Sequence, residues 1–83
     1  MAQWDYTLDV KAIWENFETV GFEESRDQIV RRIRDSRFFT EEDWSLSNIV
    51  DELGWAEDLS EFNDWWNEFY DWADFARVWV KTF

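Results

Sequence analysis

The chain has 83 residues, including eight tryptophans and eight phenylalanines, and carries a net charge of −12. We expect residues 1–83 to form a single compact acidic domain, because the chain is too short for a second core. Large aromatic side chains can supply that core, since each buries about 150–250 Å². Histidine and cysteine are absent, so the usual general base, a thiolate nucleophile, a disulfide and the common zinc ligands are all excluded.

The charge is distributed unevenly along the chain. Residues 1–40 contain eight acidic and six basic residues, whereas residues 41–83 contain twelve and two. Such a field repels nucleic acid and anionic lipid, and it attracts basic protein surfaces. Solubility alone is an equally good explanation of the acidity. No apolar run approaches the roughly 18 residues of a membrane span, and the N-terminus lacks a signal-peptide pattern, so we expect a cytoplasmic protein.

The first predicted elements are a strand and a short helical turn. Apolar and polar residues alternate from Gln3 to Val10, which predicts a half-buried strand with Trp4, Tyr6, Leu8 and Val10 on one side. The segment Lys11–Phe17 is predicted to form a short helical turn, and a continued strand is the alternative. Gly21 interrupts the connection that follows.

A helix is predicted over Phe22–Arg37, because apolar residues recur at helical spacing and acids occupy the first turns. It contains five arginines, namely Arg26, Arg31, Arg32, Arg34 and Arg37. Such a cluster can bind nucleic acid, but the acidic remainder of the molecule would repel a phosphate backbone. We therefore favour an internal role, in which this helix faces an acidic helix of its own chain and the arginine stems cover aromatic rings.

A third helix is predicted around Leu46, Ile49, Val50 and Leu53. Its candidate starts are the capping-box spacing Thr40–Asp43 and the competing N-cap Ser45, and Gly54 stands where a C′ glycine would end it. The last segment, Arg77–Phe83, is β-branched and aromatic and predicts a closing strand. The expected fold class is α+β, with about three to four helices packed on a small two-stranded sheet formed by the N- and C-terminal strands.

The segment Trp55–Ala76 has two faces when it is wound at 100° per residue. One side is apolar and contains Trp55, Leu59, Phe62, Trp66, Phe69, Ala73 and Ala76. The other side is a carboxylate stripe made of Glu57, Glu61, Asp64, Glu68 and Asp71. Trp65 and Trp72 stand at the seam, and Asp58 or Ser60 is expected to cap the helix. Like charges at this spacing cost a few tenths of a kcal/mol each, so either tertiary burial of the aromatic residues outweighs the repulsion or the charge serves a partner. In the second case the stripe and the two seam tryptophans are the predicted partner-binding residues.

No catalytic, cofactor or metal site is predicted, and the chain is not expected to be an enzyme. Acidic pairs such as Glu41 and Glu42 are frequent by chance in this composition, and a glycosidase pair would need a cleft and a carboxyl in an apolar pocket. A calcium loop of the pattern DxDxDG and a phosphate-cradling glycine loop are both absent from the sequence. A helix on a membrane surface would carry lysine and arginine where this one carries carboxylates.

Two binding hypotheses follow. In the first, the acidic surface binds a basic protein by imitating DNA. The stripe offers one charge per ~5 Å of helix axis against one per roughly 1.7 Å in duplex DNA, so mimicry would also need Glu41, Glu42, Asp43, Asp51 and Glu52. In the second, Trp65, Trp72 and Trp79 form an apolar patch for a helix-in-groove contact or a homo-oligomer, and the acids only keep the rim soluble. All three tryptophans could equally belong to the core.

The chain resembles the small acidic accessory proteins of bacteriophages, especially those that infect actinobacteria. The resemblance is carried by ESRDQIVRRIRDS in the second helix, by IVDELGWAEDLSEFNDWWNEFYDWADFARVWV, and by the closing VKTF. It implies a role in host takeover or in blocking host defence, with a host protein as the partner. Acidic anti-restriction and anti-CRISPR proteins that imitate DNA are the analogous class, but no residue-level motif of any of them is matched.

Overall fold

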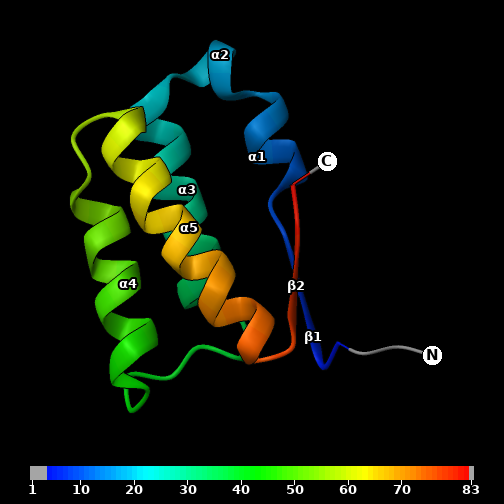
Figure 1. Ribbon diagram of the computed structural model, residues 1–83. Coiled ribbons are helices and arrows are strands. Elements are labelled where there is room, and N and C mark those ends of the chain that lie inside the picture. The colour runs from blue at the N-terminus through cyan, green and yellow to red at the C-terminus, as the bar shows by residue number, and fades with distance from the viewer. Residues whose placement is uncertain (1–3, 83) are drawn as a thin grey trace.

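The computed structural model describes residues 4–82 and confirms the predicted α+β fold (Figure 1). The elements are β1 (Tyr6–Asp9), α1 (Lys11–Glu15), α2 (Phe17–Val20), α3 (Phe22–Arg34), α4 (Trp44–Trp55), α5 (Leu59–Phe75) and β2 (Val78–Lys81). The described residues contain five helices, because two short helices, α1 and α2, follow the first strand where one helical turn was predicted. Gln3 and Phe83, the outer ends of the two predicted strands, lie outside the described residues.

The two strands pair in parallel. Tyr6 stands opposite Val78, and the register continues to Asp9 opposite Lys81. The parallel direction follows from the helices between them, since α3, α4 and α5 run alternately down, up and down in Figure 1 and return the chain to the starting end of β1. A parallel pair needs a long crossover, and here the crossover is the whole helical layer.

The core lies between that helical layer and the inner face of the sheet. Buried apolar side chains come from every element except α2, namely Leu8, Val10, Ile13, Ile29, Ile33, Leu46, Ile49, Val50, Leu53, Ala56, Phe62, Trp66, Phe69, Ala73 and Val78. Trp66 lies among aromatic neighbours, with its ring centroid 5.7 Å from that of Phe62 and 5.1 Å from that of Phe69. Stacked aromatic pairs of this kind bury large areas, which is how a small chain can make a sufficient core.

Several predicted boundaries were wrong. Asp43 caps α4, with its Oδ1 accepting from the Leu46 N–H at 3.1 Å, so neither Thr40 nor Ser45 is the N-cap. Gly54 lies inside α4 rather than at C′, and the helix runs on to Trp55 before Ala56 ends it. The arginine-rich helix ends at Arg34 instead of continuing to Arg37.

The start of α5 was predicted correctly. Asp58 is its N-cap, and its Oδ1 accepts from the Glu61 N–H at 2.8 Å. Ser60, the alternative cap, lies within the first turn. Trp55 and Leu59, predicted on the apolar side of this helix, are both exposed, because Trp55 ends α4 and Leu59 lies at the first position of α5.

The sheet is buried only in part. Leu8 and Val10 of the predicted apolar side are in the core, whereas Trp4 and Tyr6 are exposed at the open end of β1. On the outer face, Thr7 and Asp9 are exposed beside Trp79, their neighbour on β2. The predicted buried side is therefore confirmed for Leu8 and Val10 and wrong for Trp4 and Tyr6.

Candidate functional site

The carboxylate stripe projects into solvent. Glu61, Asp64, Glu68 and Asp71 are exposed on α5, and Glu57 is exposed one residue before the N-cap. Within residues 4–82 none of these five carboxylates forms an ion pair. One backbone group reaches the stripe, since the Glu57 N–H donates to Glu61 Oε2 at 3.4 Å. The stripe is therefore a row of negative charges that the rest of the described chain leaves uncompensated.

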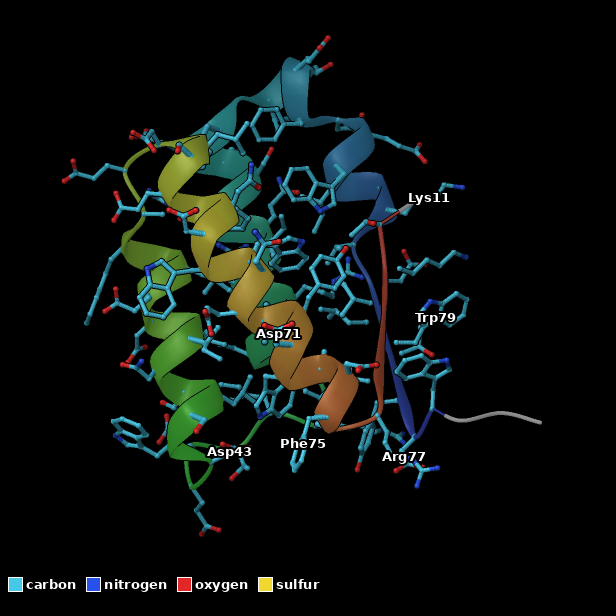
Figure 2. All side chains as sticks on the ribbon, in the orientation of Figure 1. Lys11, Asp43, Asp71, Phe75, Arg77 and Trp79 are labelled. Atoms are coloured by element: carbon cyan, nitrogen blue, oxygen red, sulfur yellow. The ribbon has the colours of Figure 1, made fainter. Side chains whose placement is uncertain are left out.

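Phe75 continues this row with an aromatic ring. It follows Asp71 by four residues, which is the next position of the three-and-four spacing of the stripe. Its side chain is 90% exposed, and it points away from the helix pair in Figure 2. Phe75 was not predicted as a site residue. The helical projection does contain a signal for it, since Phe75 falls opposite Phe62, Trp66 and Phe69.

Two tryptophans of α4 are also exposed. Trp44 directly follows the cap residue Asp43 and is 78% exposed, whereas Trp55 at the far end of the helix is 68% exposed. α4 and α5 are antiparallel neighbours, so the start of α4 meets the end of α5, and Figure 2 shows Asp43 and Phe75 at this shared end. Trp44 and Phe75 thus belong to one end of the helix pair, which we call the aromatic end.

The predicted seam tryptophans are both half-buried and packed against the core. Trp72 is held inside the molecule, since its Nε1 donates to Asp43 Oδ2 at 3.2 Å and its ring lies 5.9 Å from Phe69 between centroids. Trp65 borders an open hollow of about 380 Å³ that it lines with Asp64 and Glu68. Of the two, Trp65 is the one placed directly among the stripe carboxylates.

Some carboxylates of α4 and of the segment before it have hydrogen-bond or ion-pair partners, and others do not. Glu41 and Glu42 are exposed, and Glu52 is half-buried. Asp43 is occupied by its hydrogen bonds to Leu46 and Trp72. Asp51 accepts from Arg34 Nη2 at 2.8 Å. The charge density that DNA mimicry requires is reduced, because two of the five additional carboxylates already have partners within the chain.

The arginines of the second predicted helix largely serve the fold. Arg26 Nη1 donates to the Ala56 carbonyl at 2.8 Å and its guanidinium lies 5.6 Å from the Phe22 ring centroid. Arg34 binds Asp51 of α4, and Arg32 Nη1 donates to the Asp9 carbonyl at 3.1 Å. The predicted internal role is confirmed for Arg34, which binds an acid of α4, and for Arg26, which lies over an aromatic ring; Arg32 instead bonds the backbone of β1. Arg31 and Arg37 are exposed and make no hydrogen bond or ion pair within the described chain.

Among residues 4–82 no three acidic side chains come together in a way that could hold a metal ion. No helix of that range is long and apolar enough to cross a membrane. Comparison with protein-family models, with curated proteins and with solved structures finds no match to this chain.

Proposed function

We propose that this chain is a non-enzymatic protein that binds a basic surface of another protein through α5 and the aromatic end. The carboxylate stripe supplies long-range attraction, which raises the rate of encounter. Phe75 and Trp44 supply the short-range contacts, because a Phe side chain that leaves water contributes about 1.5–3 kcal/mol. The observation that carries this proposal is the 90% exposure of Phe75 at the end of the unpaired carboxylate row.

The resemblance to small acidic bacteriophage proteins suggests that the partner is a protein of a bacterial host and that binding takes place in the host cytoplasm. Host takeover or inhibition of a defence protein would then be the biological outcome. A target that normally binds DNA is one candidate, since a basic DNA-binding groove also attracts a carboxylate row. The row is more dilute than DNA, so a mimic of this design would depend on the apolar contacts of Phe75 and Trp44 as well as on charge.

Self-association is the second candidate function, and the exposure of Trp44, Trp55 and Phe75 favours it. Exposed aromatic patches mark contact sites whichever partner covers them. A homodimer through the aromatic end would bring two chains of charge −12 together, so it should form only when salt screens the repulsion. Sedimentation at low and high salt distinguishes the two candidates, because self-association strengthens with salt and binding to a basic protein weakens.

The test is affinity capture from an actinobacterial host lysate with four versions of the chain. The wild type should retain a host protein at low salt and release it at high salt. Glu68→Lys with Asp71→Lys, and separately Phe75→Ala, should each lose that protein. Glu18→Lys with Glu23→Lys is the matched control, because it changes the net charge equally at exposed positions of α2 and α3. Equal capture by all versions would show that α5 and the aromatic end are not the binding surface. Competition by duplex DNA for the captured protein would indicate that the chain binds as a DNA mimic.

A further inference from the structure

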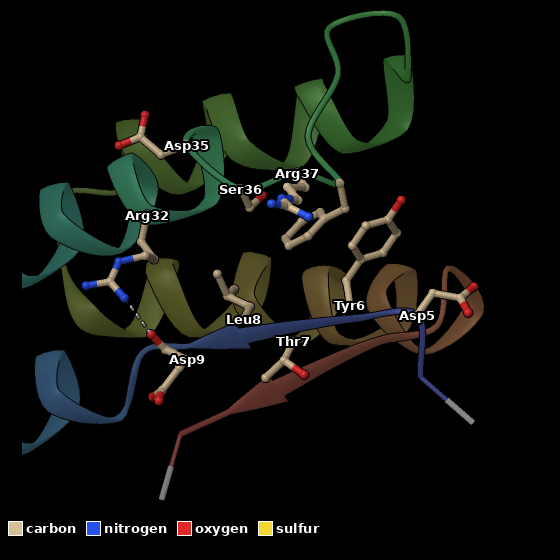
Figure 3. Close-up of a pocket in the computed structure, with 10 residues that line it drawn as sticks. Asp5, Tyr6, Thr7, Leu8, Asp9, Arg32, Asp35, Ser36 and Arg37 are labelled. Carbon is tan, nitrogen blue, oxygen red and sulfur yellow. Dashed lines mark hydrogen bonds between the residues drawn. The ribbon is translucent and has the colours of Figure 1, made fainter. Parts of the chain in front are cut away.

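A groove of about 470 Å³ runs along β1, on a different part of the molecule from the carboxylate stripe (Figure 3). One wall is the strand itself, from Asp5 to Asp9. The other wall is the last turn of α3 and the segment after it, including Arg32 and residues 35–38. The groove therefore follows the edge of β1 that is turned away from β2.

The backbone of β1 presents hydrogen-bonding groups to this groove. The Tyr6 N–H donates to the Arg77 carbonyl at 3.3 Å and the Val10 N–H to the Lys81 carbonyl at 3.0 Å, so the even-numbered residues of β1 bond to β2. Along a strand the backbone groups of successive residues point to alternate edges, so Thr7 and Asp9 face the groove. The Asp9 carbonyl confirms this direction, because it accepts from Arg32 across the groove.

Thr7 lies at the centre of this open edge. On the groove side its N–H donates no hydrogen bond to residues 4–82 and its carbonyl accepts none from them. An open strand edge with unpaired N–H and carbonyl groups is a template for one more strand. An added segment would be buried more than a peptide on a flat surface, because the α3 wall stands opposite β1.

The side chains around the edge define the chemistry of the segment that fits. Asp5, Thr7 and Asp9 share the outer face, so basic residues of an added strand would lie across from the two carboxylates, while Arg32 and Arg37 line the opposite wall. Tyr6 and Phe38 form an aromatic inner wall, with ring centroids 6.0 Å apart, which suits apolar residues at the alternate positions. A segment that alternates basic and apolar residues meets both requirements.

A second copy of the chain fits poorly at this edge. Antiparallel pairing of two β1 strands centred on Thr7 would place Asp5 of one copy across from Asp9 of the other. Like charges directly opposite each other are destabilising, and each chain already carries a charge of −12. The occupant is therefore a different protein.

We propose that the β1 groove is a second binding site, which takes an extended basic–apolar segment of a protein partner as an added third strand. This site uses none of the residues of the carboxylate stripe or the aromatic end, and its existence does not depend on the function proposed above. Recognition would combine main-chain hydrogen bonds at Thr7 with alternate side-chain contacts, as in other cases of strand addition.

The probe is a seven-residue peptide of alternating lysine and valine, titrated into the intact protein and followed by amide NMR. Binding should shift the Thr7 and Asp9 amide signals and slow hydrogen exchange at Thr7. A control peptide with the same residues in the order four lysines then three valines has the same charge but cannot alternate, so it should bind about tenfold more weakly. Equal binding of the two peptides, or shifts confined to α5, would overturn the proposal.

Two variants separate strand addition from simple charge attraction. Thr7→Pro removes the edge N–H without touching the ladder to β2, and an edge strand tolerates proline there, so the alternating peptide should bind about tenfold more weakly. Asp5→Lys reverses one outer charge and should weaken binding even if the proline variant misfolds. Glu68→Lys with Asp71→Lys should leave the Thr7 signals of the complex unchanged, and if it abolishes them the peptide binds the acidic face instead.

Discussion

The carboxylate of Asp43 bonds to both helices of the α4–α5 pair, because its Oδ2 accepts from Trp72 Nε1 at 3.2 Å while its Oδ1 caps α4. This contact joins the start of α4 to the end of α5. It lies at the same end of the helix pair as Trp44 and Phe75. The two helices also share buried apolar side chains, so Asp43 adds a polar contact to an apolar interface.

Replacing Asp43 by alanine should lower the free energy of unfolding by about 1–3 kcal/mol, since the variant loses a helix cap and leaves the Trp72 N–H without its partner. Urea denaturation measures this change. Ser45→Ala is the control, because Ser45 is exposed and does not cap the helix, and it should change the free energy of unfolding by less than about 0.5 kcal/mol. If Ser45→Ala lowered the free energy of unfolding as much as Asp43→Ala, the assignment of Asp43 as the cap would be contradicted.

Replacing Arg26 by methionine should cost about 1–3 kcal/mol, because the fully buried Ala56 would lose the donor to its carbonyl. Methionine keeps the apolar stem over Phe22, so the loss reports mainly on the hydrogen bond. Arg37→Met at an exposed position should be nearly neutral in the same urea experiment. If the two variants lose the same stability, the arginines contribute through general charge rather than through this contact.

The two glycines should respond to alanine with opposite signs. Gly21 has φ 88° and ψ 168°, a backbone conformation open almost only to glycine, so Gly21→Ala should cost about 1–3 kcal/mol. Gly54 is helical, and a Cβ there would lie 3.9 Å from the Val30 methyl groups, an ordinary contact. Gly54→Ala should therefore stabilise the protein by about 0.5–1 kcal/mol. Thermal unfolding of both variants checks the pair, and destabilisation at Gly54 would show that α4 cannot accept the added methyl.

Two aromatic residues of α5 should differ sharply on truncation. Trp66 is 5% exposed and stacked on Phe62 and Phe69, so Trp66→Ala should cost about 3–5 kcal/mol and leave much of the chain unfolded. Phe75→Ala should change stability by less than about 0.5 kcal/mol, because its side chain is in water. Circular dichroism during urea titration measures both. Loss of stability at Phe75 would mean that its ring is covered in solution.

Local patterns were sufficient for most of the secondary structure. Spacing alone limited the cap of α5 to Asp58 or Ser60, because capping depends on residues within one turn, and the structure has Asp58. The core positions Phe62, Trp66 and Phe69 follow from the 3.6-residue period, and the terminal strands follow from alternation and β-branched residues. The stripe carboxylates are solvent-exposed for the same reason, since they fall opposite the buried ring positions on a helix with one covered side.

Tertiary structure decided what local patterns left open. Thr40 and Ser45 were the predicted starts of α4, and the structure uses neither: Asp43 caps the helix, and its second oxygen accepts from Trp72, twenty-nine residues away. The parallel direction of the strands depends on how three long helices fold back on one another. Which edge of β1 stays unpaired depends on the side on which β2 pairs. The sequence by itself determined periodicity and charge, because these act between neighbouring residues. Pairing and exposure were decided only by packing, because they depend on contacts between distant segments.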